Sequence, residues 1–452
     1  KVVAGLICLA IIFSFTGCFG NKYDTDFTIK SRVGLTNNDF YELSAKDVKS
    51  IDNYEKKFNY FGVKYASDSY LKCSIVYIVD KEEIREEFFL EPSKEEIDFY
   101  SFIDNALEKV TAKKVIEFTC QPMNSQKANV KISGFTVFLR EVPKQEIFIE
   151  TENYKLGVDL LWGGALSYLE DLNSDVEAVK VDGKIKVDSN ASDRYDKRAV
   201  NKKVNLINRN DTGRLVQQSY YGTMEAPYEP ETYMDNKWNY NPVQGGNQYN
   251  DHSKIVDLKI TDNEIYVKCR PHDWAKEKEF ITPSYMEAWY TIENGTVHTT
   301  CRFVDFSGYP EADSTQEIPA FYCVAPLENF VYYAGDKPWT DDKLSYEKDL
   351  IFWPDAGYPN FYSKENWSAF TGEFEDSFGI GVYVDNEEAF LAGVFEREKT
   401  TNEDPSKDGP TSYIAIVKNR IFKSFDPYQY EYYLATGDTT EIRNTFEKID
   451  NK

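Results

Sequence analysis

Two glutamates beside apolar segments are the carboxyl groups best placed to transfer protons. Glu317 lies within residues 316–322 and Glu287 within residues 286–290, and both segments are rich in apolar and aromatic side chains. Burial beside such strands would raise the pKa of a carboxyl group and suit it to acid or base catalysis. Cleavage of a glycosidic bond usually needs two such groups. A glutamate at a strand end is often merely exposed, so both interpretations stay open.

Histidine is the second source of proton transfer near neutral pH. The chain has 3 histidines, and two of them, His252 and His272, stand next to an aspartate with aromatic residues nearby. We take these two as candidate acids or bases. A histidine next to an aspartate in a loop is also a common surface hydrogen-bonding pair, and that alternative remains.

The segment from residue 205 to 250 mixes aromatic rings with amides and arginine, a combination suited to sugar recognition. Rings pack against the C–H faces of a pyranose, and amide and guanidinium groups bind its hydroxyls. Burying mid-strand glutamines unpaired is costly, so we expect one face of this strand to be solvated or to line a cleft. A polar outer face, with the arginine bonded to a carboxylate, is the alternative. The candidate substrate-binding residues are Arg214, Gln217, Gln218, Tyr220, Tyr221, Trp238, Asn241 and Gln244.

Strand periodicity predicts how these side chains divide between two faces. Successive side chains of a strand alternate. Arg214, Gln218 and Tyr220 should therefore point to one side. Gln217, Ser219 and Tyr221 should point to the other.

Charge and motifs exclude several classes of function. The chain has 52 Lys and Arg against 76 Asp and Glu, a net charge of −24, which repels nucleic acid. We find no phosphate-binding loop, serine-hydrolase elbow, H-E-x-x-H motif, EF-hand loop or paired C-x-x-C. We predict no metal site and no cofactor; the acidic excess leaves bound calcium open, without a motif to indicate it.

The first 21 residues have the layout of an export signal. An apolar run over residues 2–15 is followed by Thr16, Gly17 and Cys18, and polar residues follow. This end resembles the lipobox of bacterial lipoproteins, which implies that Cys18 carries a lipid and anchors an exported protein to a membrane of the cell envelope. An ordinary signal peptide is the alternative. Five cysteines remain beyond it, mostly in strand-like segments, so we expect buried, unreactive thiols.

The elements that must position these residues are almost all strands, so we predict an all-β protein. In residues 22–145, short apolar runs alternate with turn signals, which favours a β-sandwich, with a bulge or bend at Ser133-Gly134. The order of features resembles the jelly-roll accessory modules of carbohydrate-active enzymes. An immunoglobulin-like spacer is the alternative.

Residues 146–452 hold too many strand segments for a small sandwich, so we predict a large antiparallel sandwich of two sheets. Asn294-Gly295 between two strand segments predicts a tight hairpin, since both residues accept positive φ. Helix is expected only at the end of the chain, over residues 440–449, and in short pieces such as residues 104–110.

The segments Trp162-Gly163-Gly164-Ala165 and Asp211-Thr212-Gly213-Arg214, with the strands after them, resemble the galactose mutarotase-like supersandwich over residues 145–437. This fold is shared by aldose epimerases and by domains of glycoside hydrolases and polysaccharide lyases. The resemblance implies a carbohydrate ligand and, in aldose epimerases, a histidine acid and a glutamate base at the open face of the sheet.

Together these features predict a cell-envelope lipoprotein that binds a carbohydrate in a groove of the large sandwich. Whether it also processes that carbohydrate, as a glycoside hydrolase, a lyase or an epimerase-like enzyme, stays open. The alternatives are a glycan-capture protein without catalysis and a structural envelope lipoprotein. A cleft that holds a carboxylate and a second proton carrier would favour the enzyme, and aromatic and amide groups without that pair would favour capture.

Overall fold

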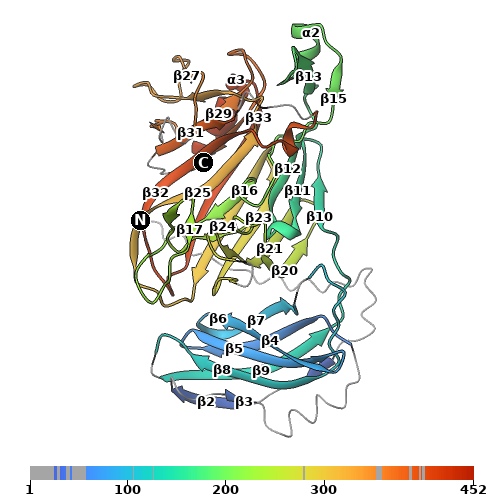
Figure 1. Cartoon of the computed structure of the whole chain (residues 1–452), viewed down its shortest axis with the longest axis vertical. Helices are drawn as coiled ribbons and strands as arrows, with labels where there is room; N and C mark the ends of the chain where they lie inside the picture. The colour runs from blue at the N-terminus through green and yellow to red at the C-terminus, as the bar shows by residue number, and fades with distance from the viewer. Residues whose placement is uncertain are drawn as a thin grey trace.

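The computed structural model describes residues 57–451, apart from residues 105, 126, 278–279, 353–358, 386–388, 397–398 and 400–402. Before residue 57 it describes only the backbone of three strands. Its sheets are antiparallel throughout the named strands, and the predicted all-β fold class is confirmed (Figure 1). Cys18 and the predicted signal lie outside the described residues. No helix among the residues described is long and apolar enough to cross a membrane.

The N-terminal region is a sandwich of a 5-stranded and a 4-stranded sheet. Phe61, Phe88, Phe118 and Phe135 meet between the sheets, with ring centroids 5.2–6.0 Å apart. The predicted β-sandwich is therefore confirmed, whereas its jelly-roll character stays a prediction. Its strands are β1 (Thr25–Phe27), β2 (Ser31–Thr36), β3 (Tyr41–Glu42), β4 (Tyr60–Ser67), β5 (Leu71–Val79), β6 (Glu82–Leu90), β7 (Ser93–Phe102), β8 (Val115–Pro122) and β9 (Lys127–Phe138).

The larger region is built on two antiparallel sheets. The 10-stranded sheet runs β10-β11-β12-β16-β25-β32-β31-β28, with β19 and β22 joined to it beside β16. Its strands are β10 (Glu146–Glu150), β11 (Tyr154–Asp159), β12 (Ala165–Asp171), β16 (Val216–Ser219), β19 (Pro242–Val243), β22 (His272–Asp273), β25 (Ala312–Val324), β28 (Asn360–Phe361), β31 (Ala389–Phe395) and β32 (Thr411–Phe422).

The second, 9-stranded sheet runs β20-β21-β23-β24-β33-β30-β29-β26-β27. The predicted hairpin joins β23 to β24, with φ of 51° at Asn294 and 75° at Gly295. The strands are β20 (Lys254–Ile260), β21 (Glu264–Arg270), β23 (Ser284–Glu293), β24 (Thr296–Asp305), β26 (Asn329–Tyr332), β27 (Ser345–Glu347), β29 (Trp367–Thr371), β30 (Gly379–Tyr383) and β33 (Tyr428–Gly437).

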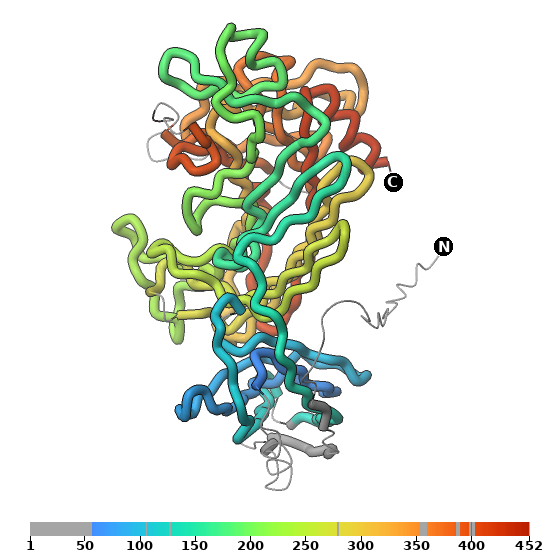
Figure 2. Tube along the Cα trace, turned by 90° about the vertical axis from the view of Figure 1, so that its right-hand side faces the viewer, coloured from blue at the N-terminus to red at the C-terminus, as the bar shows by residue number. Residues whose placement is uncertain are grey.

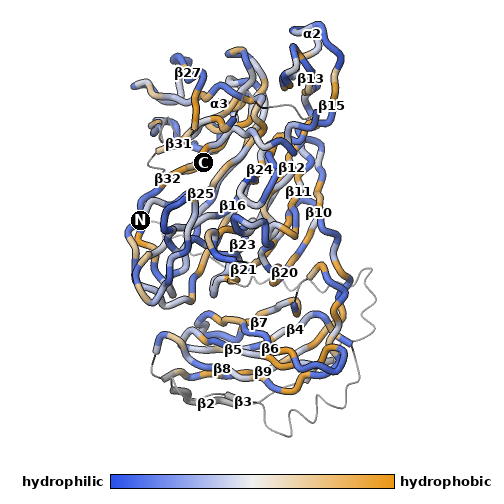
Figure 3. The backbone as a smooth tube through the Cα atoms, viewed as in Figure 1, coloured by the Kyte–Doolittle hydropathy of each residue, from blue (hydrophilic) through white to orange (hydrophobic). Residues whose placement is uncertain are grey.

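The main core lies between the two large sheets, because alternate side chains of each strand point inward. Phe321 of β25 and Ile414 of β32 reach it from one sheet, and Met286 of β23 and Tyr432 of β33 from the other. Figure 3 shows hydrophobic segments concentrated along these strands and hydrophilic ones in the loops. Each sheet also has an outer face, and α3 (Thr439–Asp450) packs on that of the nine-stranded sheet.

Smaller elements decorate this frame. They are a 3-stranded sheet with a short helix beside it, a β-hairpin and two single 3₁₀ turns. Residues 104–110 form turns in their described part, and the expected helix there is wrong, because so short a segment cannot offset the cost of helix nucleation. The elements are β13 (Glu177–Val181), β14 (Lys184–Asp188), β15 (Ala199–Asn201), α2 (Ala191–Tyr195), β17 (Thr232–Tyr233), β18 (Asn236–Lys237), η1 (Leu160–Trp162) and η3 (Pro405–Lys407).

The N-terminal sandwich rests against one end of the larger region (Figures 1 and 2). The Tyr60 hydroxyl donates to Asp257 Oδ1 at 2.7 Å, and the Phe89 amide donates to the Tyr285 hydroxyl at 2.9 Å. Arg302 binds Glu91 of the sandwich. The predicted boundary at residues 145 and 146 falls between β9 and β10.

The five cysteines of the described residues are all free and buried. Burial raises the pKa of the Cys301 thiol to about 12. A thiol of this kind is protonated and a poor nucleophile at neutral pH, in agreement with the expectation from sequence.

Candidate functional site

A bulge in β25 brings Glu317 to the outer face of the ten-stranded sheet. Glu317 pairs with Val417 of β32 and Ala320 with Ala415, so three steps along β25 match two along β32. The extra residue places Glu317 on the same face as Ala320 and Tyr322. Ala320 and Tyr322 pack on this outer face with Tyr413. We call Arg214, Tyr221, Glu317, Tyr322 and Tyr413 the tyrosine face.

The carboxyl group of Glu317 sits between two phenols. Burial raises its pKa, and hydrogen bonds to Tyr413 and Tyr221 oppose that shift without cancelling it. Glu317 therefore holds a proton more readily than a free glutamate does, as the sequence predicted. A carboxyl group of this kind can donate or accept a proton at a bound ligand.

Arg214 joins the same face, although strand periodicity assigned it to the opposite one. Leu215 has φ of 80°, so β16 begins only after it and the alternation does not reach Arg214. The guanidinium carbon lies 5.5 Å from the ring centroids of Tyr322 and Phe395. Its Nη2 donates to the Gly409 carbonyl at 3.3 Å. The expected division is correct for the rest: Tyr220 lies in the main core, and Tyr221 lies beside Glu317.

Half-buried aromatic rings continue outward from Tyr221. Its ring centroid lies 6.3 Å from that of Trp238, and Tyr233 of the β17–β18 hairpin lies 5.0 Å from Trp238 and 5.5 Å from Trp274, all edge to face. The Trp238 indole nitrogen donates to Asn241 Oδ1 at 3.0 Å. The face therefore combines flat apolar surface with hydroxyl, guanidinium and carboxyl groups.

Three amides predicted to bind substrate make hydrogen bonds that connect parts of the protein. Gln218 is fully buried; its Nε2 donates to the Glu287 carbonyl across the sandwich at 3.0 Å, and its Oε1 accepts from Tyr220. Gln244 Nε2 donates to the Gly163 carbonyl at 3.2 Å, and Asn241 Nδ2 to the Tyr220 carbonyl at 2.7 Å.

Gln217 is on the outer side of β16 but is also buried. Its Nε2 donates to the carbonyls of Thr212 and Arg214, at 2.9 and 2.6 Å, and its Oε1 accepts from the Gly245 amide. Both mid-strand glutamines are therefore buried, and their side-chain amides are paired. Gln217 shapes the loop that carries Arg214.

Glu287 lies on the other side of the sandwich, within a cluster of cations. Its Oε2 accepts from Arg302 at 2.7 Å and its Oε1 from Tyr266 at 2.7 Å, with Lys268 Nζ 3.8 Å away. Burial favours a higher pKa, but Lys268 and Arg302 outweigh burial and lower it. This direction is opposite to the one predicted. The neighbours of Glu287 in the chain, Met286 and Ala288, lie in the main core, so Glu287 is on the outer face of the nine-stranded sheet. Glu287 and Glu317 are therefore on opposite sides of the sandwich and form no catalytic pair in this structure.

The two candidate histidines differ in exposure. His252 is exposed, whereas His272 on β22 is buried. Burial lowers the pKa of His272, against the attraction of Asp251. Two strands, β19 and β16, separate β22 from β25, so the sheet does not place His272 beside Glu317.

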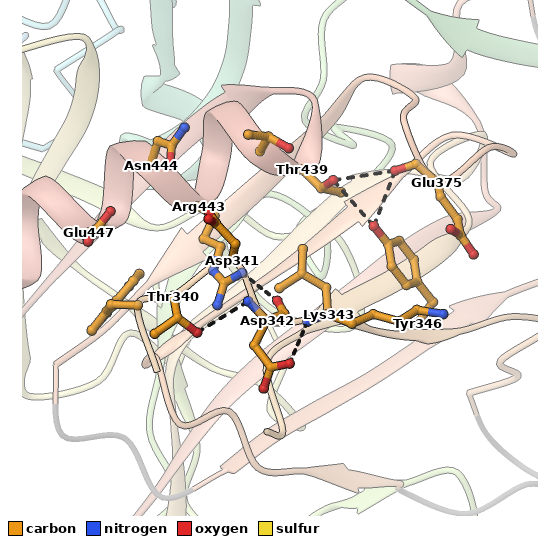
Figure 4. Close-up of a pocket in the computed structure, with 13 residues that line it drawn as sticks. Thr340, Asp341, Asp342, Lys343, Tyr346, Glu375, Thr439, Arg443, Asn444 and Glu447 are labelled. Carbon is orange, nitrogen blue, oxygen red and sulfur yellow. Dashed lines mark hydrogen bonds between the residues drawn. The ribbon is translucent and has the colours of Figure 1, made fainter. Parts of the chain in front are cut away.

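A pocket of about 640 Å³ opens elsewhere, between α3 and residues 339–346 (Figure 4). Trp339, Tyr346 and Arg443 line it together with several acidic side chains. Arg443 is already paired with the fully buried Glu365. This pocket lies on the outer face of the nine-stranded sheet and contains none of the predicted site residues, so we do not regard it as the candidate site.

No group of three or more potential metal ligands occurs within the part of the chain that the structure describes.

The prediction from sequence missed four residues of this site, which are Tyr322, Tyr413, Tyr233 and Trp274. Alternation along β25 and β32 could have placed the two tyrosines on an outer face, but only the pairing with β16 brings that face to Tyr221 and Arg214.

Comparison with known proteins gives weak similarities only. No family model and no curated protein matches the chain. A galactose mutarotase related enzyme from Lactobacillus acidophilus is 11% identical, covers 65% of this chain and 98% of its own, and has a TM-score of 0.35. A galactose mutarotase-like protein from Clostridium acetobutylicum is 10% identical, covers 65% and 95%, and has a TM-score of 0.33.

Galactose 1-epimerase from Lactobacillus acidophilus is 10% identical over 66% of this chain and 96% of its own, with a TM-score of 0.33. Similarity at this level assigns no activity and no residue role to this chain.

Proposed function

We propose that the protein binds a carbohydrate on the tyrosine face of the ten-stranded sheet. The observation that carries the proposal is the meeting of half-buried rings with Arg214 and with Glu317, whose pKa is raised. Rings stack on the C–H faces of sugars, while guanidinium, phenol and carboxyl groups bind hydroxyls. The groove residues predicted from sequence contribute Arg214, Tyr221 and Trp238 to this surface.

Tryptophan fluorescence tests this location. Residues 22–452 would be titrated with a panel of plant, algal and host polysaccharides. We expect Trp238→Phe to remove the fluorescence response and weaken binding. Trp289→Phe is the matched control, because Trp289 is a half-buried tryptophan on the other sheet, 4.9 Å from Tyr266. Equal responses from both variants would place the binding surface elsewhere.

We further infer that Glu317 transfers a proton if the bound sugar is processed, as in a glycoside hydrolase, a lyase or an epimerase-like enzyme. Glu317→Gln keeps the size and hydrogen bonding of the side chain but cannot ionise. Release of products should fall about 100-fold or more, while sugar affinity changes little. Full turnover in this variant would contradict the role of Glu317.

Capture without catalysis is the second candidate function. It is favoured by the placement of Glu287 and Glu317 on opposite faces, which leaves Glu317 without the second predicted carboxylate. Sugar binding by the wild type with no products from any polysaccharide of the panel would decide for capture.

We also propose that the chain is exported and held in the cell envelope by a lipid on Cys18. The support is the apolar run over residues 2–15 that ends shortly before this cysteine. The full chain expressed in a bacterial host should partition into the detergent phase, and Cys18→Ala should shift it to the aqueous phase. Equal partition of both forms would contradict a lipid anchor.

A further inference from the structure

We propose that the tyrosine face selects an anionic sugar, one that carries a carboxylate or a sulfate, and that Arg214 binds this group. The inference rests on the proposed carbohydrate function and names the ligand class of the same site. Nothing in the charge of the whole chain suggests it, since acidic residues outnumber basic ones by 76 to 52. The surroundings of Arg214 are what suggest an anionic ligand.

Arg214 is held in place without an acidic partner. Arg209, Arg302 and Arg443 form ion pairs with Glu146, Glu91 and Glu365. Within the described residues, no carboxylate lies within ion-pair distance of Arg214, and its one side-chain hydrogen bond runs from Nη2 to the Gly409 carbonyl. Its Nε is buried with no partner, and Nη1 has none within the described residues.

The phenols around Arg214 are neutral. Burial raises the pKa values of Tyr221, Tyr322 and Tyr413, so these phenols keep their protons. Burial also favours the neutral form of Glu317. Asp211, the acidic residue nearest in sequence, accepts hydrogen bonds from the Gly213 amide and Asn210 Nδ2. Among the residues that the structure describes, no carboxylate forms an ion pair with this half-buried cation.

An anion on the ligand would supply a compensating charge. A guanidinium group offers planar, paired donors that match a carboxylate or a sulfate, and the rings of Tyr322 and Phe395 limit its motion. The sugar ring itself would then lie toward Tyr221 and Trp238, whose rings continue the face.

Matched pairs of polysaccharides test the proposal. The wild type would be titrated with polygalacturonate and its fully methyl-esterified form, and with a sulfated galactan and its desulfated form. We expect one acidic form to bind about tenfold or more tightly than its neutral partner, with an affinity that falls as NaCl is added. The pair that shows the preference identifies a carboxylate or a sulfate as the group.

Variants assign the preference to Arg214. Arg214→Gln should abolish the preference, and Arg214→Lys should keep part of it, because the charge remains and the planar fork is lost. Arg420→Gln is the control, since Arg420 also lies over a ring, that of Tyr428 at 3.8 Å, but pairs with Asp426. Thermal unfolding would confirm that each variant is folded.

The possible failures are distinguishable. Equal binding of acidic and neutral forms, or a preference that survives in Arg214→Gln, would overturn the anionic ligand and leave the carbohydrate function intact. Absence of binding to all four polysaccharides would also overturn the anionic ligand, and absence of binding to the wider panel of plant, algal and host polysaccharides would overturn the carbohydrate function.

Discussion

Asp273 is a carboxyl group with no exposed surface. Its Oδ2 accepts from the Tyr228 hydroxyl at 2.8 Å. Burial raises the pKa of Asp273 to about 6, although Tyr228 and Lys276 oppose the shift. The folded protein therefore favours the protonated form, and ionisation of Asp273 at neutral pH destabilises the fold.

This direction gives a pH-dependent prediction for Asp273→Asn, which keeps the shape without the charge. The protonated Asp273 makes its full contribution to the free energy of unfolding of the wild type below about pH 4. That contribution is lost as the pH rises through about 6. The variant should therefore be more stable than the wild type at pH 7.5, by roughly 2–3 kcal/mol, and the difference should shrink at pH 4. Urea unfolding at both pH values measures it; an equal difference at both would contradict the raised pKa.

Helix α3 is stabilised by hydrogen bonds at its first turn and by one apolar stripe that packs on the sheet. Asp438 Oδ1 accepts from the amides of Thr440 and Glu441, and the Glu441 carboxylate accepts from the Asp438 amide. Ile442 and Phe446 are fully buried against the nine-stranded sheet. The capping box fixes where the helix begins, and the buried side chains attach it to the sheet.

Removal of this cap should cost a predictable amount. Asp438→Ala should lower the free energy of unfolding by about 1 kcal/mol, because two amides at the helix start lose their acceptor. Lys448→Ala, at an exposed position of the same helix, should change stability much less. Urea unfolding measures both. Similar losses in the two variants would show that the cap contributes nothing specific.

At the scale of the whole molecule, one arginine connects the two regions. Arg302 binds Glu91 of the N-terminal sandwich and Glu287 of the large one, and its side chain is only 22% exposed. Phe89 and Tyr285 pack nearby, and the core of the N-terminal sandwich continues into residues of the larger region such as Val304 and Phe306. These contacts couple the two regions.

Arg302→Met should therefore destabilise the protein strongly. It leaves Glu287 buried with Lys268 as its remaining cation, so we expect a loss of about 3 kcal/mol in the free energy of unfolding. Glu287→Met in addition should recover part of the loss. Arg85→Met breaks the exposed pair with Glu117 and should cost under about 1 kcal/mol. Chemical denaturation compares the variants; equal losses for Arg302 and Arg85 would contradict a structural role for this junction.

Local patterns in the sequence were sufficient for most of the strands. The Asn294-Gly295 hairpin and the bulge at Ser133-Gly134 appear where they were predicted, the latter as a shift from the Lys64–Gly134 pair to Tyr65–Ile132. The hairpin depends on the positive φ that Asn294 and Gly295 accept, a preference that the sequence states directly. The C-terminal helix was likewise predicted to within one residue at each end.

The candidate site needed the tertiary structure. The sequence determined that an all-β protein carries aromatic, arginine and carboxyl groups that suit a sugar, and it identified Arg214, Tyr221, Trp238 and Glu317 among them. Strand pairing between distant segments decided that a bulge turns Glu317 toward Tyr221, that Gln218 bridges the core and that Glu287 faces the opposite way. A strand has two faces, and which one becomes covered depends on partners that lie far away in the chain.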